Sequence, residues 1–304
     1  MARASPDTDV MQGADVSAQV EIRDGTPHWY LSPDIWVVPG SDPDGPPGSP
    51  VAGQPAFVWA RIENHGDQDA LGVRVDVWWA DPTFQVTRTH AHHIGTAFGD
   101  ALVGGGPQDV LCLVPWLPVV VNDGHECLVA TATYPGGSLP TPPPDAFDPP
   151  TYLEVAQKNL TVLTMARAMF RVLTLAGLPR TDAVFALTVE VGETLDERTL
   201  AGLGLARVRP AKEPTVRAGL RLETGCPAPD DPEAPQKLEV RVPAGRQRAV
   251  QLALTGTPPA DGEYQVVRVE QRHEDAVLGG IAFVVVGTSP RRTDTSQRTD
   301  KEDA

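Results

Sequence analysis

Residues Gln54–Pro82 read QPAFVWARIENHGDQDALGVRVDVWWADP, and this stretch decides the fold. In its first part, apolar side chains occupy the alternate positions Val58, Ala60 and Ile62. In its second part, they occupy the alternate positions Val73, Val75, Val77 and Trp79. Between the two parts lies a polar segment, Asn64–Asp67, whose residues tolerate turn geometry. Alternation with a period of two predicts two β-strands that each bury one face, as strands of an antiparallel β-sandwich do.

The composition favours the same fold class. The chain has 304 residues, of which 41% are hydrophobic, so it is long enough to build a sizeable core. Its 31 prolines and 28 glycines are typical of a β protein rich in loops. We therefore predict an all-β protein with two tandem β-sandwich domains, the first of them immunoglobulin-like, with long loops rich in proline and glycine and with flexible termini.

The predicted organisation has four parts. They are a flexible tail or edge strand at 1–28, an immunoglobulin-like sandwich at 29–163, a second sandwich at 164–288 and a disordered tail at 289–304. A short helix is predicted within Leu195–Leu205, where two acidic residues stand at the positive end. Phe84–Asp100 is expected to be an irregular excursion, and Val155–Val162 is expected to be the closing strand of the first domain.

Several segments resemble the bacterial cell-adhesion-related (CARDB-like) domain, an immunoglobulin-like β-sandwich. They are SPDIWV at Ser32–Val37, the opening stretch with its Asn64-His65-Gly66 turn, HECLVATATY at His125–Tyr134 and VAQKNLTV at Val155–Val162. The resemblance covers residues 29–162, a little under half of the chain. It implies a binding or spacer module of the kind found in surface or secreted proteins, and it implies no catalytic residues.

The formal net charge of -15 excludes nucleic acid as a natural partner, because a phosphate backbone would be repelled. No stretch approaches the roughly 20 apolar residues of a membrane helix, so membrane insertion is not expected. The first residues lack the apolar core of a classical signal peptide. The expected location is therefore the cytoplasm, or the exterior by a non-classical export route.

Tryptophans supply the predicted binding surface. All six lie within the first 116 residues, and Trp78 and Trp79 must point to opposite faces of their strand. One of that pair is expected in the core and the other exposed or covered by the proline loop. Trp36 and Trp79 are the predicted binding residues, because an exposed indole can form a platform for a protein or a carbohydrate.

A histidine group is the sharpest candidate for metal chemistry. His90, His92 and His93 lie close together, and in a strand the first two would share a face and could present two imidazoles to Zn, Ni or Cu. The alternative is an exposed polar loop with incidental histidines, which we favour. We therefore expect no cofactor.

Catalytic motifs are missing from the sequence, which contains neither a GxSxG elbow nor an HExxH pair. Three cysteines are present, Cys112, Cys127 and Cys226, and the first two lie in neighbouring predicted strands. They form either a disulfide or, as we favour, a pair of small buried apolar side chains. Neither arrangement indicates an enzyme.

The sequence thus predicts a non-enzymatic binding or structural module that engages another protein or serves as an accessory subunit of a larger assembly. The alternative is a carbohydrate-binding or hydrolase-accessory module that uses exposed tryptophans.

Overall fold

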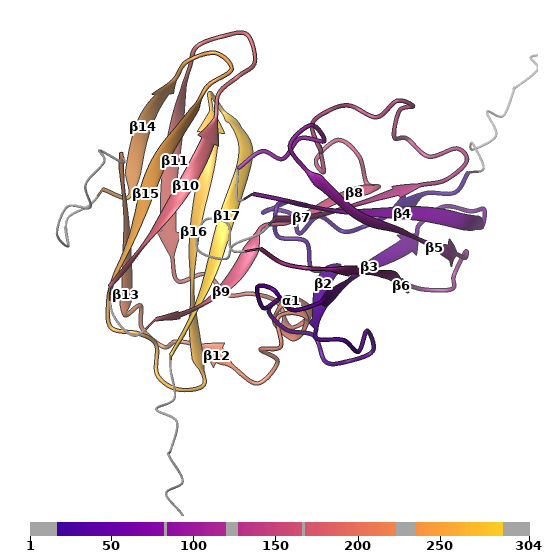
Figure 1. The fold of residues 1–304 in the computed structure, drawn as a ribbon, viewed down its shortest axis with the longest axis horizontal. Coiled ribbons are helices and arrows are strands. Elements are labelled where there is room, and N and C mark those ends of the chain that lie inside the picture. Colours follow the sequence, from indigo (N-terminus) through magenta and orange to yellow (C-terminus); the bar gives the residue numbers. More distant parts are fainter. Residues whose placement is uncertain (1–16, 82–83, 120–126, 166–167, 223–234, 288–304) are drawn as a thin grey trace, which may run out of the picture.

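A computed structural model describes residues 17–81, 84–119, 127–165, 168–222 and 235–287. This part of the chain is built of strands with a single short helix, so the predicted all-β, sandwich-type fold is confirmed. Four sheets form two face-to-face pairs, which lie side by side in Figure 1. Of the predicted tail or edge strand at 1–28, residues 17–28 are described and include a short strand at Val20–Glu21. Residues 1–16 and the predicted tail at 289–304 lie outside the described residues.

The first sheet pair holds most of the first half of the chain. Sheet 1 contains β1 (Val20–Glu21), β2 (Ile35–Pro39), β3 (Ala56–Asn64) and β6 (Gln108–Trp116). Sheet 2 contains β4 (Ala70–Ala80), β5 (His92–Ala101), β7 (Cys127–Thr133) and β8 (Val155–Lys158). Every strand pair within these two sheets is antiparallel.

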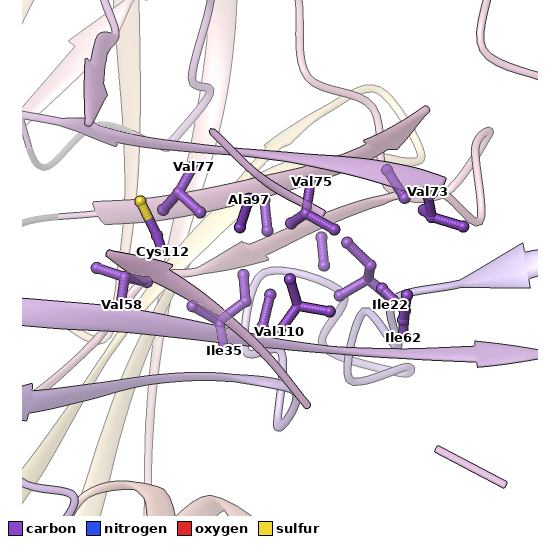
Figure 2. Close-up of a cluster of buried hydrophobic side chains, with 14 of the residues drawn as sticks. Ile22, Ile35, Val58, Ile62, Val73, Val75, Val77, Ala97, Val110 and Cys112 are labelled. Carbon is purple, nitrogen blue, oxygen red and sulfur yellow. The ribbon is translucent and has the colours of Figure 1, made fainter. Parts of the chain in front are cut away.

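The two strands of the opening stretch face each other across the first core. β3 belongs to sheet 1 and β4 belongs to sheet 2, so the turn between them carries the chain from one sheet to the other. Figure 2 shows Val73, Val75 and Val77 of β4 pointing toward Val58 and Ile62 of β3. The alternating apolar residues are therefore the inner faces of both layers, and their burial supplies the main hydrophobic stabilisation of this half.

The second sheet pair repeats this arrangement with other strands. Sheet 3 contains β10 (Met169–Ala176), β13 (Val216–Leu222) and β15 (Gln247–Gly256). Sheet 4 contains β9 (Leu160–Met165), β11 (Ala183–Val191), β12 (Arg209–Pro210), β14 (Lys237–Val242), β16 (Glu263–His273) and β17 (Ala276–Gly287). A second core of Val, Leu, Ile and Phe side chains lies between these two sheets. That each sheet pair is a separate domain stays a prediction.

A third cluster of buried side chains joins the two sheet pairs. The segment before β2 contributes Tyr30 and Leu31, and helix α1 (Glu197–Gly202) contributes Leu200. These side chains pack against Tyr264 and Val284 on the outer face of sheet 4. The predicted helix within Leu195–Leu205 is therefore confirmed, and it lies at the junction in Figure 1.

The expectation of one closing strand at Val155–Val162 is wrong. The chain leaves sheet 2 after β8 and enters sheet 4 as β9, which pairs in parallel with β17. Asn159 makes the break, because its side-chain amide donates to the Gly280 carbonyl at 2.7 Å while its backbone N–H donates to the Tyr30 carbonyl at 2.8 Å. The predicted boundary between residues 163 and 164 consequently falls inside β9.

The expected irregular excursion at Phe84–Asp100 is also wrong, since β5 occupies its second half. β5 is an edge strand, and two of its residues that face β6 are glycines. The segment therefore shows no regular alternation of large apolar side chains. A Cβ added at Gly95 would lie 2.7 Å from Val114 Cγ2, so only glycine lets β5 approach β6 this closely.

The cysteines Cys112 and Cys127 are both free and buried, as small apolar side chains. Cys112 belongs to the core between sheets 1 and 2, whereas Cys127 belongs to a cluster on the other face of sheet 2. Burial raises the pKa of both thiols, so neither is a ready nucleophile. Cys226 lies outside the described residues. Within the described part of the chain, no helix has the length and apolar character needed to cross a membrane.

Candidate functional site

A pocket of about 270 Å³ opens where the outer face of sheet 1 meets α1. It is lined by Pro33, Trp36, Pro47, Arg61, Arg198, Ala201 and Gly202. The lining comes from β2 with the segments before and after it, from β3 and from the distant helix. Segments of both sheet pairs therefore form its wall. The pocket lies at the same junction as the third cluster of buried side chains.

Trp36 in this pocket is held by a second tryptophan. It stands opposite Trp59 in the register of β2 and β3, on the face that points away from the core. The two indoles are stacked, with ring centroids 5.8 Å apart and an angle of 10° between their planes. Trp59 Nε1 donates a hydrogen bond to the Pro43 carbonyl at 3.1 Å. This cross-strand pair fixes the orientation of Trp36.

Arg61 forms the next part of the wall. Its guanidinium carbon lies 5.5 Å from the centroid of the Trp36 ring, within the range of a cation–π contact. Arg61 Nε and Nη2 both donate to the carboxylate of Asp109 on β6, the Nη2 bond measuring 2.8 Å. The hydrogen bonds to Asp109 raise the pKa of Arg61, and the fork geometry holds its plane in place.

Arg198 brings a second guanidinium from α1. Its Nη1 lies 2.9 Å from Oδ1 of Asp34, a carboxylate that is only 3% exposed. Arg23 binds the same carboxylate through two N–H groups, each at 2.9 Å. One buried acid is thus shared by two arginines, and it ties α1 to the start of β2.

The ends of α1 explain its position. Asp196 caps the helix, and its side chain accepts from the Thr199 backbone N–H at 2.9 Å. Burial raises the pKa of Asp196, but the hydrogen bonds from Thr199 outweigh this and leave it below its ordinary value. At the other end, a Cβ on Gly202 would lie 3.2 Å from Trp36 Cβ and 3.6 Å from Lys158 Nζ. The small residue allows the helix to contact sheet 1.

Trp79, the second predicted binding residue, lies elsewhere. It belongs to β4 in sheet 2, where its ring packs against the first core and stacks on His92 with centroids 4.4 Å apart. Trp78 occupies the opposite face, beneath Leu139 and Phe147 of the proline-rich loop, as expected for that pair. Trp36 and Trp79 therefore belong to different sheets and have different partners.

The three predicted metal ligands are engaged separately. His90 precedes β5, and its Nδ1 lies 2.8 Å from the Thr87 hydroxyl. His92 stacks on Trp79, and His93 contacts the Asp76 carboxylate at 3.1 Å from the opposite face of the strand. Among the residues that the structure describes, no group of three or more His, Cys, Asp or Glu side chains is arranged to hold a metal ion.

Sequence reasoning identified Trp36 but missed the residues around it. Trp59 could have been found, because it points outward from the same alternating stretch. Arg61 lies two residues further along the same strand, so the same alternation predicts that it shares the outward face of Trp59. Arg198 could not be found, since no local pattern connects α1 with a strand more than 150 residues earlier in the chain.

Comparisons with known proteins leave this site unassigned. No protein-family model matches the chain, and no curated protein matches it. Among solved structures, red sea bream transglutaminase has 11% sequence identity and a TM-score of 0.22, over 84% of this chain and 31% of that chain. The chain thus spans about a third of that enzyme's length. The fold and the pocket define a sandwich-type all-β protein with a surface site of tryptophan and arginine.

Proposed function

We propose that this chain is a non-enzymatic binding module, an accessory subunit that holds a protein partner at the Trp36 pocket. The observation that carries the proposal is the gathering of one tryptophan and two guanidinium groups around a single pocket at the surface. Tryptophan and arginine are the residue types that dominate the energetic centres of protein interfaces.

The pocket is organised before any partner arrives. Trp36 is held by Trp59, Arg61 by Asp109 and Arg198 by Asp34. Side chains that are already fixed lose little rotamer freedom on binding, which leaves more of the contact energy for affinity. Arg198 uses one N–H group for Asp34, and the side chain is 40% exposed, so donors remain for a partner.

The chemistry of the wall indicates the kind of segment that fits. Two prolines and an indole provide apolar walls, while the guanidinium groups provide donors at the rim. At about 270 Å³ the pocket is smaller than the usual range for drug-sized ligands, so it suits one inserted side chain. A proline or aromatic residue next to a carboxylate would satisfy both features.

A carbohydrate is the weaker candidate. A sugar ring needs a free indole face, and the Arg61 guanidinium already lies over the Trp36 ring. The sequence resemblance to the cell-adhesion-related domain also favours a protein partner.

Site-specific photo-crosslinking in an extract of the host tests the proposal. A crosslinking residue at Ala201 lies in the pocket wall, and one at Val184 lies on β11, where the side chain is 52% exposed. We expect one protein to be captured from position 201 and not from position 184. Trp36→Ala in the same molecule should abolish that capture.

The captured protein is then purified and its affinity measured. Trp36→Ala should weaken binding by about tenfold or more, as for a residue at an interface centre. Phe98→Ala is the matched control, because this aromatic is 69% exposed on β5 and belongs to the other sheet. If Trp36→Ala stays folded and binds as the wild type does, the proposal fails. Specific glycan binding that Trp36→Ala removes would establish the carbohydrate alternative instead.

A further inference from the structure

A second, smaller cavity of about 40 Å³ lies on the other side of Gly202 from the Trp36 pocket. Its lining includes Trp116 of β6, Lys158 of β8, Thr161 of β9 and Leu203. A cavity of this size holds one or two water molecules or a single ion of similar radius. Its chemistry is set by the few polar groups that reach it.

Lys158 brings a buried positive charge to this cavity. The residue is 5% exposed, and its ammonium group donates one hydrogen bond, to the Ile35 carbonyl at 2.7 Å. No carboxylate among the described residues forms an ion pair with it, and Asp196 acts only at longer range. Burial lowers the pKa of Lys158 to about 8, because the charged form has lost water without gaining a counter-ion.

Trp116 adds a second donor without an acceptor. Its side chain is 4% exposed, and the indole Nε1 has no hydrogen-bond partner. Buried N–H groups are nearly always paired, and an unpaired one is costly. Of the other side chains that line the cavity, only those of Ser49 and Thr161 are polar, and each brings a neutral hydroxyl. The rest, including Val37, Leu128 and Leu160, provide no acceptor.

We propose that this cavity is a binding site for a small monovalent anion of the halide class, held between the Lys158 ammonium and the Trp116 indole N–H. A ligand here must accept from two donors, compensate one buried positive charge and fit the volume of one or two waters. A halide meets all three conditions. Water compensates no charge, and gluconate or sulfate is too large for the space.

The anion site is independent of the proposed partner pocket, although α1 borders both. Leu203, directly after α1, lines the cavity, and Gly202 separates it from Trp36. A bound ion would therefore stabilise the contact between the helix and sheet 1. Its effect should be visible in the stability of the whole chain without any partner present.

Thermal unfolding of the full chain tests the proposal. The protein is prepared free of halide and measured in sodium chloride and in sodium gluconate at equal ionic strength. A ligand that binds only the folded state stabilises it by mass action, so about 0.2 M chloride should raise the midpoint by about 2 °C over gluconate. Bromide should act as chloride does.

Three variants locate the effect. Lys158→Met removes the charge and Trp116→Phe removes the donor, so each should abolish the chloride-dependent rise. Lys212→Met removes an exposed ammonium elsewhere and should keep it. A crystal of the wild type grown in bromide should show the ion between Lys158 Nζ and Trp116 Nε1. Equal midpoints in chloride and gluconate, a rise that persists in both cavity variants, or a bromide crystal with only water at this position would overturn the proposal.

Discussion

Individual buried polar residues decide how the strands of this protein are connected. Asp34 binds two arginines, Asn159 redirects the chain from one sheet pair into the other, and Lys158 lines a cavity at their junction. None of the three belongs to a regular alternation of apolar residues in the sequence. Each matters because a buried polar group without a partner is unfavourable, so its hydrogen bonds restrict the arrangements the chain can adopt.

Lys158 should give the stability of the protein a distinct pH dependence in buffer free of halide. Its folded pKa of about 8 lies below the ordinary 10.5. Between these values the unfolded chain holds a proton that the folded chain has released, so the free energy of unfolding rises with pH. Compared with Lys158→Met, the wild type should gain about 2 kcal/mol from pH 8 to pH 10. Urea unfolding at several pH values measures this, and a difference that stays constant with pH would contradict it.

Among the secondary-structure elements, β5 shows how an edge strand is accommodated. It pairs with β4 on one side and faces β6 on the other, where the two sheets of the first pair come together. Its outward residues include His93, Thr96 and Phe98, which carry no apolar period. The sequence pattern therefore predicted β3, β4 and β11 well but missed β5, because the buried positions of β5 are Gly95, Ala97 and Ala101, whose small side chains give little apolar periodicity.

Gly95→Ala should destabilise the protein through this contact. The added Cβ would meet Val114 Cγ2 at 2.7 Å and Cys112 Sγ at 2.8 Å, so β5 or β6 would have to move. Overpacking of this kind costs about 1–3 kcal/mol. Urea unfolding should show a lower midpoint for Gly95→Ala, whereas Phe98→Ala on the same strand should stay within about 0.5 kcal/mol of the wild type. An unchanged midpoint in Gly95→Ala would show that the two strands are not closely packed.

At the scale of the whole molecule, the main feature is the junction at which the two sheet pairs contact each other. Tyr30 lies before β2 of the first pair, yet its ring covers Gly280 of sheet 4, where an added Cβ would lie 2.1 Å from the ring carbon Cζ. The Tyr30 hydroxyl also donates to Glu270 at 2.8 Å. These contacts couple the two cores, so we expect the two sheet pairs to unfold in a single transition.

Tyr30→Ala should separate the two unfolding events. Loss of the buried ring removes about 3–5 kcal/mol, whereas Tyr30→Phe loses only the hydrogen bond to a carboxylate, about 1.5–3 kcal/mol. Scanning calorimetry should show one transition for the wild type and for Tyr30→Phe, and two for Tyr30→Ala. A single transition in Tyr30→Ala would mean that the remaining contacts suffice to couple the cores.

The sequence by itself determined that this protein is built of strands, where most of them lie, and which faces they bury. These properties depend on neighbours one or two positions apart, and residues such as Val58, Ala60 and Ile62 carry them directly. Only the tertiary structure decided that β3 and β4 face each other across a core, that β9 joins sheet 4, and that Arg198 and Trp36 line one pocket. The last two join segments that are far apart in the chain, and all three depend on burial and hydrogen bonding that no local pattern records.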